Sequence, residues 1–204
     1  MITDHQIETL ALIAAFFDRC RFGYEGFEGY RKSTDLYKFL GCIQELESSA
    51  LIDPQRTVFA DLGCADGRVN ILMSYFVRLS LGIEIDPEIL AEFGPRKAEL
   101  CSRLEQAKLT PPPANITLFQ GSSLDPQTYS KVYAEVDVRF ADIDLFYTYI
   151  TLHDLFAEQI AAEAKPGALY LVYGFNRVLP RYRKLEILAP DLGSQGIAAL
   201  YRKE

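Results

Sequence analysis

TVFADLGCADGRVNILMSYFVRLSLGIEIDP, residues 57–87, is predicted to form a strand, a glycine loop, a helix, a second strand and an acidic turn. Residues 57–60 are β-branched, aromatic or apolar, which favours a buried strand. The loop at residues 61–67 carries small residues where a backbone can bend tightly. Residues 69–76 have apolar side chains at helical spacing, and residues 81–83 return as a strand. Such a unit is a right-handed crossover between parallel strands. Its loop and strand ends therefore meet at the carboxyl edge of the sheet, where open α/β sheets bind ligands.

The loop lacks the known phosphate-binding patterns. It contains no GxxxxGK[ST], and the glycine spacing in residues 63–67 does not match GxGxxG. The carboxylates of Asp61 and Asp66 flank the loop and would repel a pyrophosphate, so they favour a ligand with a cationic part and hydroxyl groups. Glu84, at the end of the second strand, is placed to accept two hydrogen bonds from a ribose diol. A charged acceptor strengthens such bonds.

These residues carry a resemblance to a known family. DLGCADGR at residues 61–68 resembles motif I of the class I S-adenosylmethionine-dependent methyltransferases, and GIEIDP at residues 82–87 resembles their second motif. Ala65 stands where motif I usually has its middle glycine. The two stretches are most similar to the branch that holds the mitochondrial ATP-synthase c-subunit lysine methyltransferases. The seven-strand histone lysine methyltransferases are more distant relatives.

The resemblance implies a cofactor, S-adenosylmethionine, and a product, S-adenosylhomocysteine. It implies that the cofactor lies on the two motifs and on the turn after the third strand. There the family often has an Asp that contacts the adenine, but this chain has Ser122, so Ser122, Ser123 or Asp125 is expected to serve. The expected cofactor-binding residues are Asp61, Gly63, Cys64, Ala65, Asp66, Gly67, Glu84, Ile85, Ser122 and Ser123. The chemistry requires no metal.

Two catalytic candidates come from a predicted fourth strand at residues 136–146 (VDVRFADIDLF). Asp144 and Tyr147 lie toward its end, which in this fold faces the substrate and the methyl group. Asp144 is predicted to orient a substrate amine or to act as a general base, and the alternative is a structural cap. Tyr147 is the second candidate. The NPPY signature is absent, which argues against DNA or glutamine as the methyl acceptor.

The remaining pattern completes an α/β fold. We predict a Rossmann-like, doubly wound, mostly parallel seven-stranded sheet with helices on both faces and an N-terminal helical cover. The chain is expected to be one domain, residues 1–204, with a cap or lid at 1–50 and a cofactor-binding core at 57–204. Further helices are predicted at residues 3–20, 36–46, 87–109 (broken at Gly94 and Pro95) and 151–165, and further strands at 115–120, 168–175, 184–189 and 196–201.

Two segments leave alternatives open. Residues 21–31 (RFGYEGFEGYR) interleave glycines with aromatic side chains, as in a packed irregular connection or in a lid over cofactor and substrate. The basic cluster of Arg177, Arg181, Arg183 and Lys184 is either a solvated face or a contact for an anionic substrate.

The charge and the cysteine content of the chain favour some substrates and cellular compartments over others. The net charge of −7 argues against nonspecific nucleic-acid binding and favours a basic substrate, such as a lysine side chain or another amine. The four cysteines form no CxxC pair, which argues against a zinc site or disulfide framework and favours a reducing cytoplasm. No run of 18 apolar residues is present, so no membrane span is expected. The N-terminus lacks the pattern of a signal peptide.

The expected function is methyl transfer to a nucleophilic acceptor: a protein lysine, another amine or a small molecule. One alternative is a noncatalytic module of the same fold that binds S-adenosylmethionine or S-adenosylhomocysteine. Another is an aminopropyl transferase that makes polyamines from the decarboxylated cofactor. That enzyme would need an acidic stretch after the fourth strand, which residues 145–149 (LFYTY) do not supply.

Overall fold

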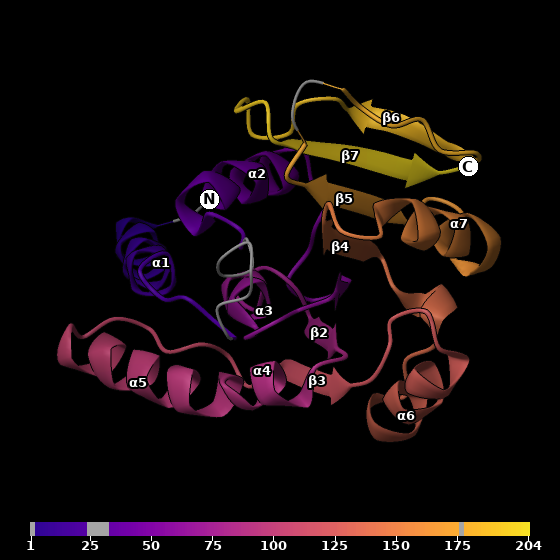
Figure 1. Ribbon diagram of the computed structural model, residues 1–204. Coiled ribbons are helices and arrows are strands. Elements are labelled where there is room, and N and C mark those ends of the chain that lie inside the picture. The colour runs from indigo at the N-terminus through magenta and orange to yellow at the C-terminus, as the bar shows by residue number, and fades with distance from the viewer. Residues whose placement is uncertain (1–2, 24–32, 176–177) are drawn as a thin grey trace.

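A seven-stranded, mostly parallel sheet with helices on both faces forms the frame of the molecule (Figure 1). The computed structural model describes residues 3–23, 33–175 and 178–204. Its elements are, in chain order, α1 (Asp4–Phe17), α2 (Leu36–Ser48), β1 (Val58–Leu62), α3 (Arg68–Met73), β2 (Leu79–Glu84), α4 (Pro87–Ala91), α5 (Phe93–Gln106), β3 (Ile116–Gln120), α6 (Pro126–Val136), the 3-10 helix η1 (Phe140–Asp142), β4 (Leu145–Tyr149), α7 (His153–Glu163), β5 (Leu169–Tyr173), β6 (Leu185–Ala189) and β7 (Ala198–Lys203).

The strand order places a switch point at the centre of the sheet. The order is β3-β2-β1-β4-β5-β7-β6. Strands β1 to β5 pair in parallel, and β7 runs antiparallel to both β5 and β6. From β1 the chain moves outward to β2 and β3 on one side and then to β4 and β5 on the other. A crevice opens outside the carboxyl ends of the strands at such a reversal. The predicted fold class is confirmed.

Two hydrophobic cores lie on opposite faces of the sheet. One packs beneath α1, α2, α3 and α5, and the other beneath α6 and α7. Figure 1 shows these two groups of helices on opposite sides of the strands. In β1, Phe59 joins the first core while Val58, Ala60 and Leu62 join the second. Side chains alternate along a strand, so the carboxylate of Asp61 points to the same face as Phe59.

The prediction of a strand over residues 136–146 is wrong. Val136 ends α6, Asp137 follows in the left-handed conformation with φ 54°, and β4 begins only at Leu145. The apolar residues Val138 and Phe140 are buried in the second core from a turn and from η1. Their burial explains the apolar pattern that suggested a strand.

The helix predicted over residues 87–109 is two helices. α4 ends at Ala91, and Glu92 separates it from α5. Gly94 and Pro95, where a break was predicted, lie in the first turn of α5. Proline is tolerated there because the amide hydrogens of the first turn have no partner within the helix. The break exists, a few residues earlier than predicted.

The helices α1 and α2 cover one face of the sheet, and hydrogen bonds to the side chain of Asp18 hold the end of α1 against the start of α2. The Asp18 carboxylate accepts hydrogen bonds from the backbone nitrogens of Leu36 at 2.8 Å and Tyr37 at 3.1 Å. The residue after α1 therefore caps the start of α2.

The predicted connection or lid at residues 21–31 lies outside the described residues from position 24 onward. Among the described helices, none is long and apolar enough to cross a membrane, and the cytoplasmic location stays a prediction.

Candidate cofactor-binding site

A cavity of about 40 Å³ opens where β1 and β4 end, at the switch point of the sheet. Its walls come from the loop after β1, from the end of β4 and from the chain on either side of the α1–α2 connection. The residues that line it are Phe22, Ser33, Thr34, Asp61, Gly63, Cys64, Ala65, Arg68, Val69, Tyr147 and Tyr149. Four of the ten predicted cofactor-binding residues are thus in its wall.

Asp61 is a buried carboxylate that has no partner among the described residues. Its side chain lines the cavity and the residue is 2% exposed. No hydrogen bond or ion pair joins its carboxylate to any residue that the structure describes. Burial, followed by the nearby Glu84 and Asp66, raises its pKa well above the ordinary value. A carboxylate held this way is stabilised by a ligand that brings positive charge or hydrogen-bond donors into the cavity.

The loop after β1 is shaped for close approach. Gly63 has φ +97°, and a Cβ built on it would meet no atom within 4 Å, so its backbone is open to a ligand. Ala65, where motif I usually has glycine, also lies in the left-handed region with φ 49°. At Gly67 a Cβ would lie only 2.6 Å from the Phe93 ring, so the helix α3 requires glycine at its start.

Glu84 holds the shape of this loop. One carboxylate oxygen, Oε2, accepts the amide hydrogen of Ala65 at 3.0 Å, and Oε1 accepts that of Asp86 at 2.9 Å. Glu84 is 5% exposed, while the side chain of the next residue, Ile85, is 64% exposed. Each carboxylate oxygen has a further lone pair, so Glu84 retains the capacity to accept ligand hydroxyls.

The predicted adenine contacts lie at the neighbouring strand end. The carbonyl of Glu84 accepts the amide hydrogen of Gly121 at 2.9 Å, which sets the turn after β3 beside β2. In that turn the Ser122 hydroxyl accepts from the Leu124 amide at 3.2 Å. Ser123 is buried, and its carbonyl accepts the Tyr129 hydroxyl at 2.8 Å. Glu84, Ile85, Ser122 and Ser123 follow the same edge outside the cavity.

Asp66 has a different position from the one predicted. It is fully buried, does not line the cavity, and forms an ion pair with two arginines. Its oxygens lie 2.9 Å from Nε and 3.0 Å from Nη2 of Arg68, and 3.2 Å from Nη1 of Arg96. Its charge is therefore already compensated, in contrast to that of Asp61.

Arg68 fastens the N-terminal helices to the loop. Besides Asp66, its guanidinium donates to the carbonyls of Phe17 at 3.2 Å and Cys20 at 3.0 Å, and to the Ser33 hydroxyl at 3.1 Å. It also packs over the ring of Phe22, 5.1 Å from the ring centre. One side chain thus joins both ends of the α1–α2 connection to the start of α3.

Tyr147, a predicted catalytic residue, lies in the cavity wall. It is 2% exposed, and its hydroxyl forms a hydrogen bond with the Thr34 hydroxyl. Burial is the main cause that raises the pKa of Tyr147 well above its ordinary value. The phenol therefore stays protonated at neutral pH, and its catalytic role stays a prediction. Tyr149, two residues further along β4, is half-buried in the same wall.

Asp144 lies at the opposite edge of the sheet, which corrects its predicted catalytic role. It precedes β4, and its Oδ2 accepts the amide hydrogen of Val58, at the start of β1, at 2.7 Å. Its other oxygen pairs with Lys165. Parallel strands begin at one edge and end at the other, so Asp144 stands at the amino edge, away from the cavity. Both of its carboxylate oxygens have partners there.

Several wall residues were not predicted from the sequence. Tyr149 shares a strand face with Tyr147, so the period of two could have identified it. Phe22 belongs to residues 21–31, for which a lid over cofactor and substrate is one predicted alternative, and it does line the cavity. Ser33 and Thr34 reach the cavity only because α1 and α2 fold back over the loop. No local pattern carries that information. The described residues contain no group of three or more His, Cys, Asp or Glu side chains that could hold a metal ion.

Comparison with known proteins relates the fold to methyltransferases. No family model matches the sequence, and no curated protein matches it. Among solved structures, the tRNA methyltransferase TrmI from Aquifex aeolicus is 9% identical with a TM-score of 0.54, covering 96% of this chain and 76% of that one. A proposed methyltransferase, yhhF from Escherichia coli, is 13% identical with a TM-score of 0.53, covering 85% and 87%. A precorrin-6y methyltransferase from Geobacter metallireducens is 14% identical with a TM-score of 0.51, covering 82% and 73%. The chain has the fold of these proteins.

Proposed function

We propose that this chain binds S-adenosylmethionine and transfers its methyl group to a nucleophilic acceptor. The observation that carries the proposal is the buried carboxylate of Asp61, which faces a cavity at the switch point and has no partner in the described part of the chain. S-adenosylmethionine carries a sulfonium and an ammonium group, so it supplies the positive charge that this carboxylate lacks. The methyltransferase fold and the motif at residues 61–68 support the same ligand.

The residues at the carboxyl edge fit the different parts of this cofactor. Asp61 would face its cationic end, and the open backbone at Gly63 would leave room for it. Glu84 would accept hydrogen bonds from the ribose, and Ile85 offers exposed apolar surface beside it. Ser122 and Ser123 would serve the adenine. Sites that enclose a whole ligand measure roughly 300–1,000 Å³. The cavity of about 40 Å³ therefore takes only one end, and the rest lies along this edge.

The main contribution of the chain to the reaction would be alignment. When bound, the cofactor supplies a methyl group on a positively charged sulfur, which is a good leaving group. Phe22, Tyr147 and Tyr149 form aromatic walls that exclude water from this end of the cavity. Alignment of two reactants with exclusion of water can lower a barrier by about 7–11 kcal/mol. An amine acceptor must arrive neutral, which a desolvating wall favours.

The acceptor is proposed to be an amine, with a protein lysine as the first candidate. The net charge of −7 favours a basic substrate, and the resemblance to the c-subunit lysine methyltransferase branch agrees with it. A small-molecule acceptor is the second candidate. Nucleic acid ranks lower because the chain is acidic, although the fold is shared with a tRNA methyltransferase. A noncatalytic module that only binds the cofactor is the alternative function.

Transfer of label from the cofactor tests this proposal. The purified protein is incubated with methyl-labelled S-adenosylmethionine and a cell extract, which is then separated into protein, nucleic acid and small-molecule fractions. We expect label in protein, at the side-chain nitrogen of lysine. Asp61→Asn should abolish it, and Asp137→Asn, an exposed residue in the left-handed conformation that asparagine tolerates, should not. Binding of the cofactor without label in any fraction would favour the noncatalytic module.

A further inference from the structure

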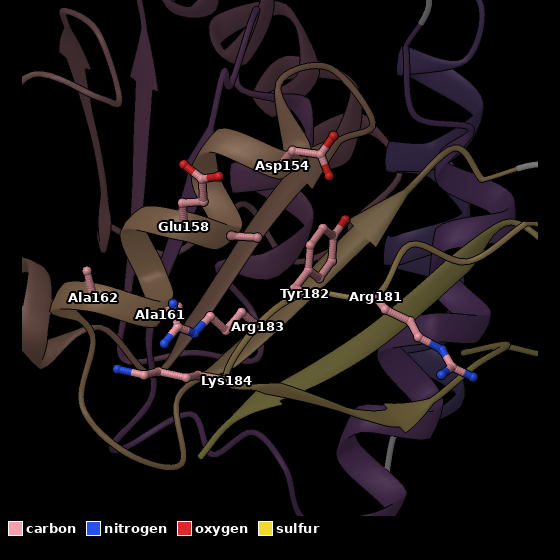
Figure 2. A pocket seen from close by; sticks show the side chains of 9 residues that line it. Asp154, Glu158, Ala161, Ala162, Arg181, Tyr182, Arg183 and Lys184 are labelled. Atoms are coloured by element: carbon pink, nitrogen blue, oxygen red, sulfur yellow. The ribbon is translucent and has the colours of Figure 1, made fainter.

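A groove of about 510 Å³ lies between α7 and residues 181–184, apart from the cavity described above (Figure 2). It shares no lining residue with the cavity near Gly63. Three alanines of α7, Ala157, Ala161 and Ala162, line it and leave the space open. Tyr182 lines it as well, and its hydroxyl is 2.6 Å from Nδ1 of His153 at the start of α7.

Charges of opposite sign are separated along this groove. Asp154 lies at the start of α7 and Glu158 one turn further on, at the middle of the helix (Figure 2). Arg183 and Lys184 extend toward its other end. No described residue forms an ion pair or hydrogen bond with the side chains of Glu158, Arg183 or Lys184. Asp154 lies 3.2 Å from the adjacent His153 and has no cation from across the groove.

The length of the groove fits an extended segment of chain. It follows α7 from Asp154 to Ala162, which lie eight positions apart, and at a rise of about 1.5 Å per residue this is about 12 Å. An extended polypeptide spans about 12 Å with roughly four residues. A free amino acid has its two charges much closer together, so it would not reach both ends. Phosphates of a nucleic acid would meet the two carboxylates and be repelled.

We infer that this groove binds an extended polypeptide segment with a basic and an acidic residue about three positions apart. The basic side chain pairs with Asp154 and Glu158, and the acidic side chain pairs with Arg183 and Lys184. The open alanine surface between them accommodates the backbone of the segment. This inference does not depend on the cofactor, and it holds whether or not the chain is a methyltransferase.

Amide chemical shifts of the intact, nitrogen-15-labelled protein test the inference. The probes are peptides with an acetylated N-terminus and an amidated C-terminus. The mixed-charge peptides are Gly-Lys-Gly-Gly-Glu-Gly and its reverse sequence. The uniformly charged peptides have two lysines or two glutamates at these positions. At least one mixed-charge peptide should shift the amides of α7 and residues 178–184 with a millimolar Kd. The uniformly charged peptides should bind at least about fivefold more weakly. The inference is overturned if no peptide shifts these amides, if uniform charge binds equally well, or if free lysine with free glutamate reproduces the shifts.

Two charge reversals on the same helix provide a matched comparison. Glu158→Lys should weaken binding of the mixed-charge peptide at least about fivefold, near the upper end for a solvent-exposed ion pair. Glu163→Lys makes the same change on an exposed residue outside the groove and should leave the Kd unchanged. Arg183→Glu should weaken binding as much as Glu158→Lys does. Equal weakening by Glu163→Lys would show that only net charge matters, and would refute a defined groove.

Discussion

Burying a carboxylate without a hydrogen-bond donor costs free energy of folding. Asp61 is such a carboxylate at the cavity, since none of the residues that the structure describes donates to it. Its pKa in the folded chain is raised from 3.8, first by burial and then by Glu84 and Asp66. Between 3.8 and the raised pKa, the folded state holds a proton that the unfolded state has released. The free energy of unfolding therefore falls as pH rises through this window. A cationic ligand reverses the effect by pairing with the ionised form.

Asp61→Asn tests this cost directly. We expect the empty variant to be more stable than the parent at neutral pH, by about 1–3 kcal/mol, because the unpaired charge is gone. Urea unfolding at several pH values should show a smaller loss of stability with rising pH. S-adenosylmethionine should raise the Tm of the parent by more than that of the variant. A variant that is less stable, and whose Tm the cofactor raises as much as that of the parent, would refute the assigned role.

Glu84→Ala is expected to weaken S-adenosylmethionine binding by about 1.5–3 kcal/mol, or roughly 10- to 150-fold. The variant loses an acceptor for the ribose and the two bonds that hold Ala65 and Asp86. Isothermal titration measures the change. Glu88→Ala, on an exposed residue in the first turn of α4, should have no effect. An unchanged Kd for Glu84→Ala would exclude the ribose from this position.

Among the elements, the Asp66–Arg68 pair joins the N-terminal helices to the loop after β1. Arg68→Met leaves the buried Asp66 with Arg96 alone and removes the bonds to Phe17, Cys20 and Ser33. We expect a loss of about 3–5 kcal/mol in the free energy of unfolding, measured with urea. Arg202→Met, which breaks an exposed pair at 3.9 Å with Glu186, should cost less than about 1 kcal/mol. Equal costs would contradict the role of Arg68.

The elements also show what a sequence can predict. β1, the loop and β2 were found because apolar runs, glycines and a terminal carboxylate lie close together in residues 57–87. β4 was placed too early because buried residues of a turn and of η1 resemble a strand in composition. Because the strand was predicted to begin at residue 136, Asp144 was expected at the carboxyl edge of the sheet, whereas it lies at the amino edge. The cavity walls from Ser33 and Thr34 depend on long-range packing, which no local pattern records.

Across the whole molecule, the charged side chains at the two edges of the sheet differ in whether they have partners. The carboxyl edge holds the cavity with Asp61, whose carboxylate has no partner within residues 3–23, 33–175 and 178–204. The amino edge holds satisfied contacts, such as those of Asp144 with Lys165 and the Val58 amide. Asp144→Asn should therefore lower stability by about 1–3 kcal/mol while leaving cofactor affinity and turnover unchanged. Unfolding and transfer assays on the same preparation measure both. If the variant lost turnover but kept the stability of the parent, Asp144 would have a catalytic role after all.

Isothermal titration of the intact protein with S-adenosylmethionine, and separately with S-adenosylhomocysteine, measures whether the cavity at Asp61 and Gly63 is a cofactor site. We expect both to bind with micromolar Kd values, and Asp61→Asn to reduce the affinity for each by at least about tenfold. A folded protein that binds neither compound would contradict the assignment of the cavity at Asp61 and Gly63 as a cofactor site.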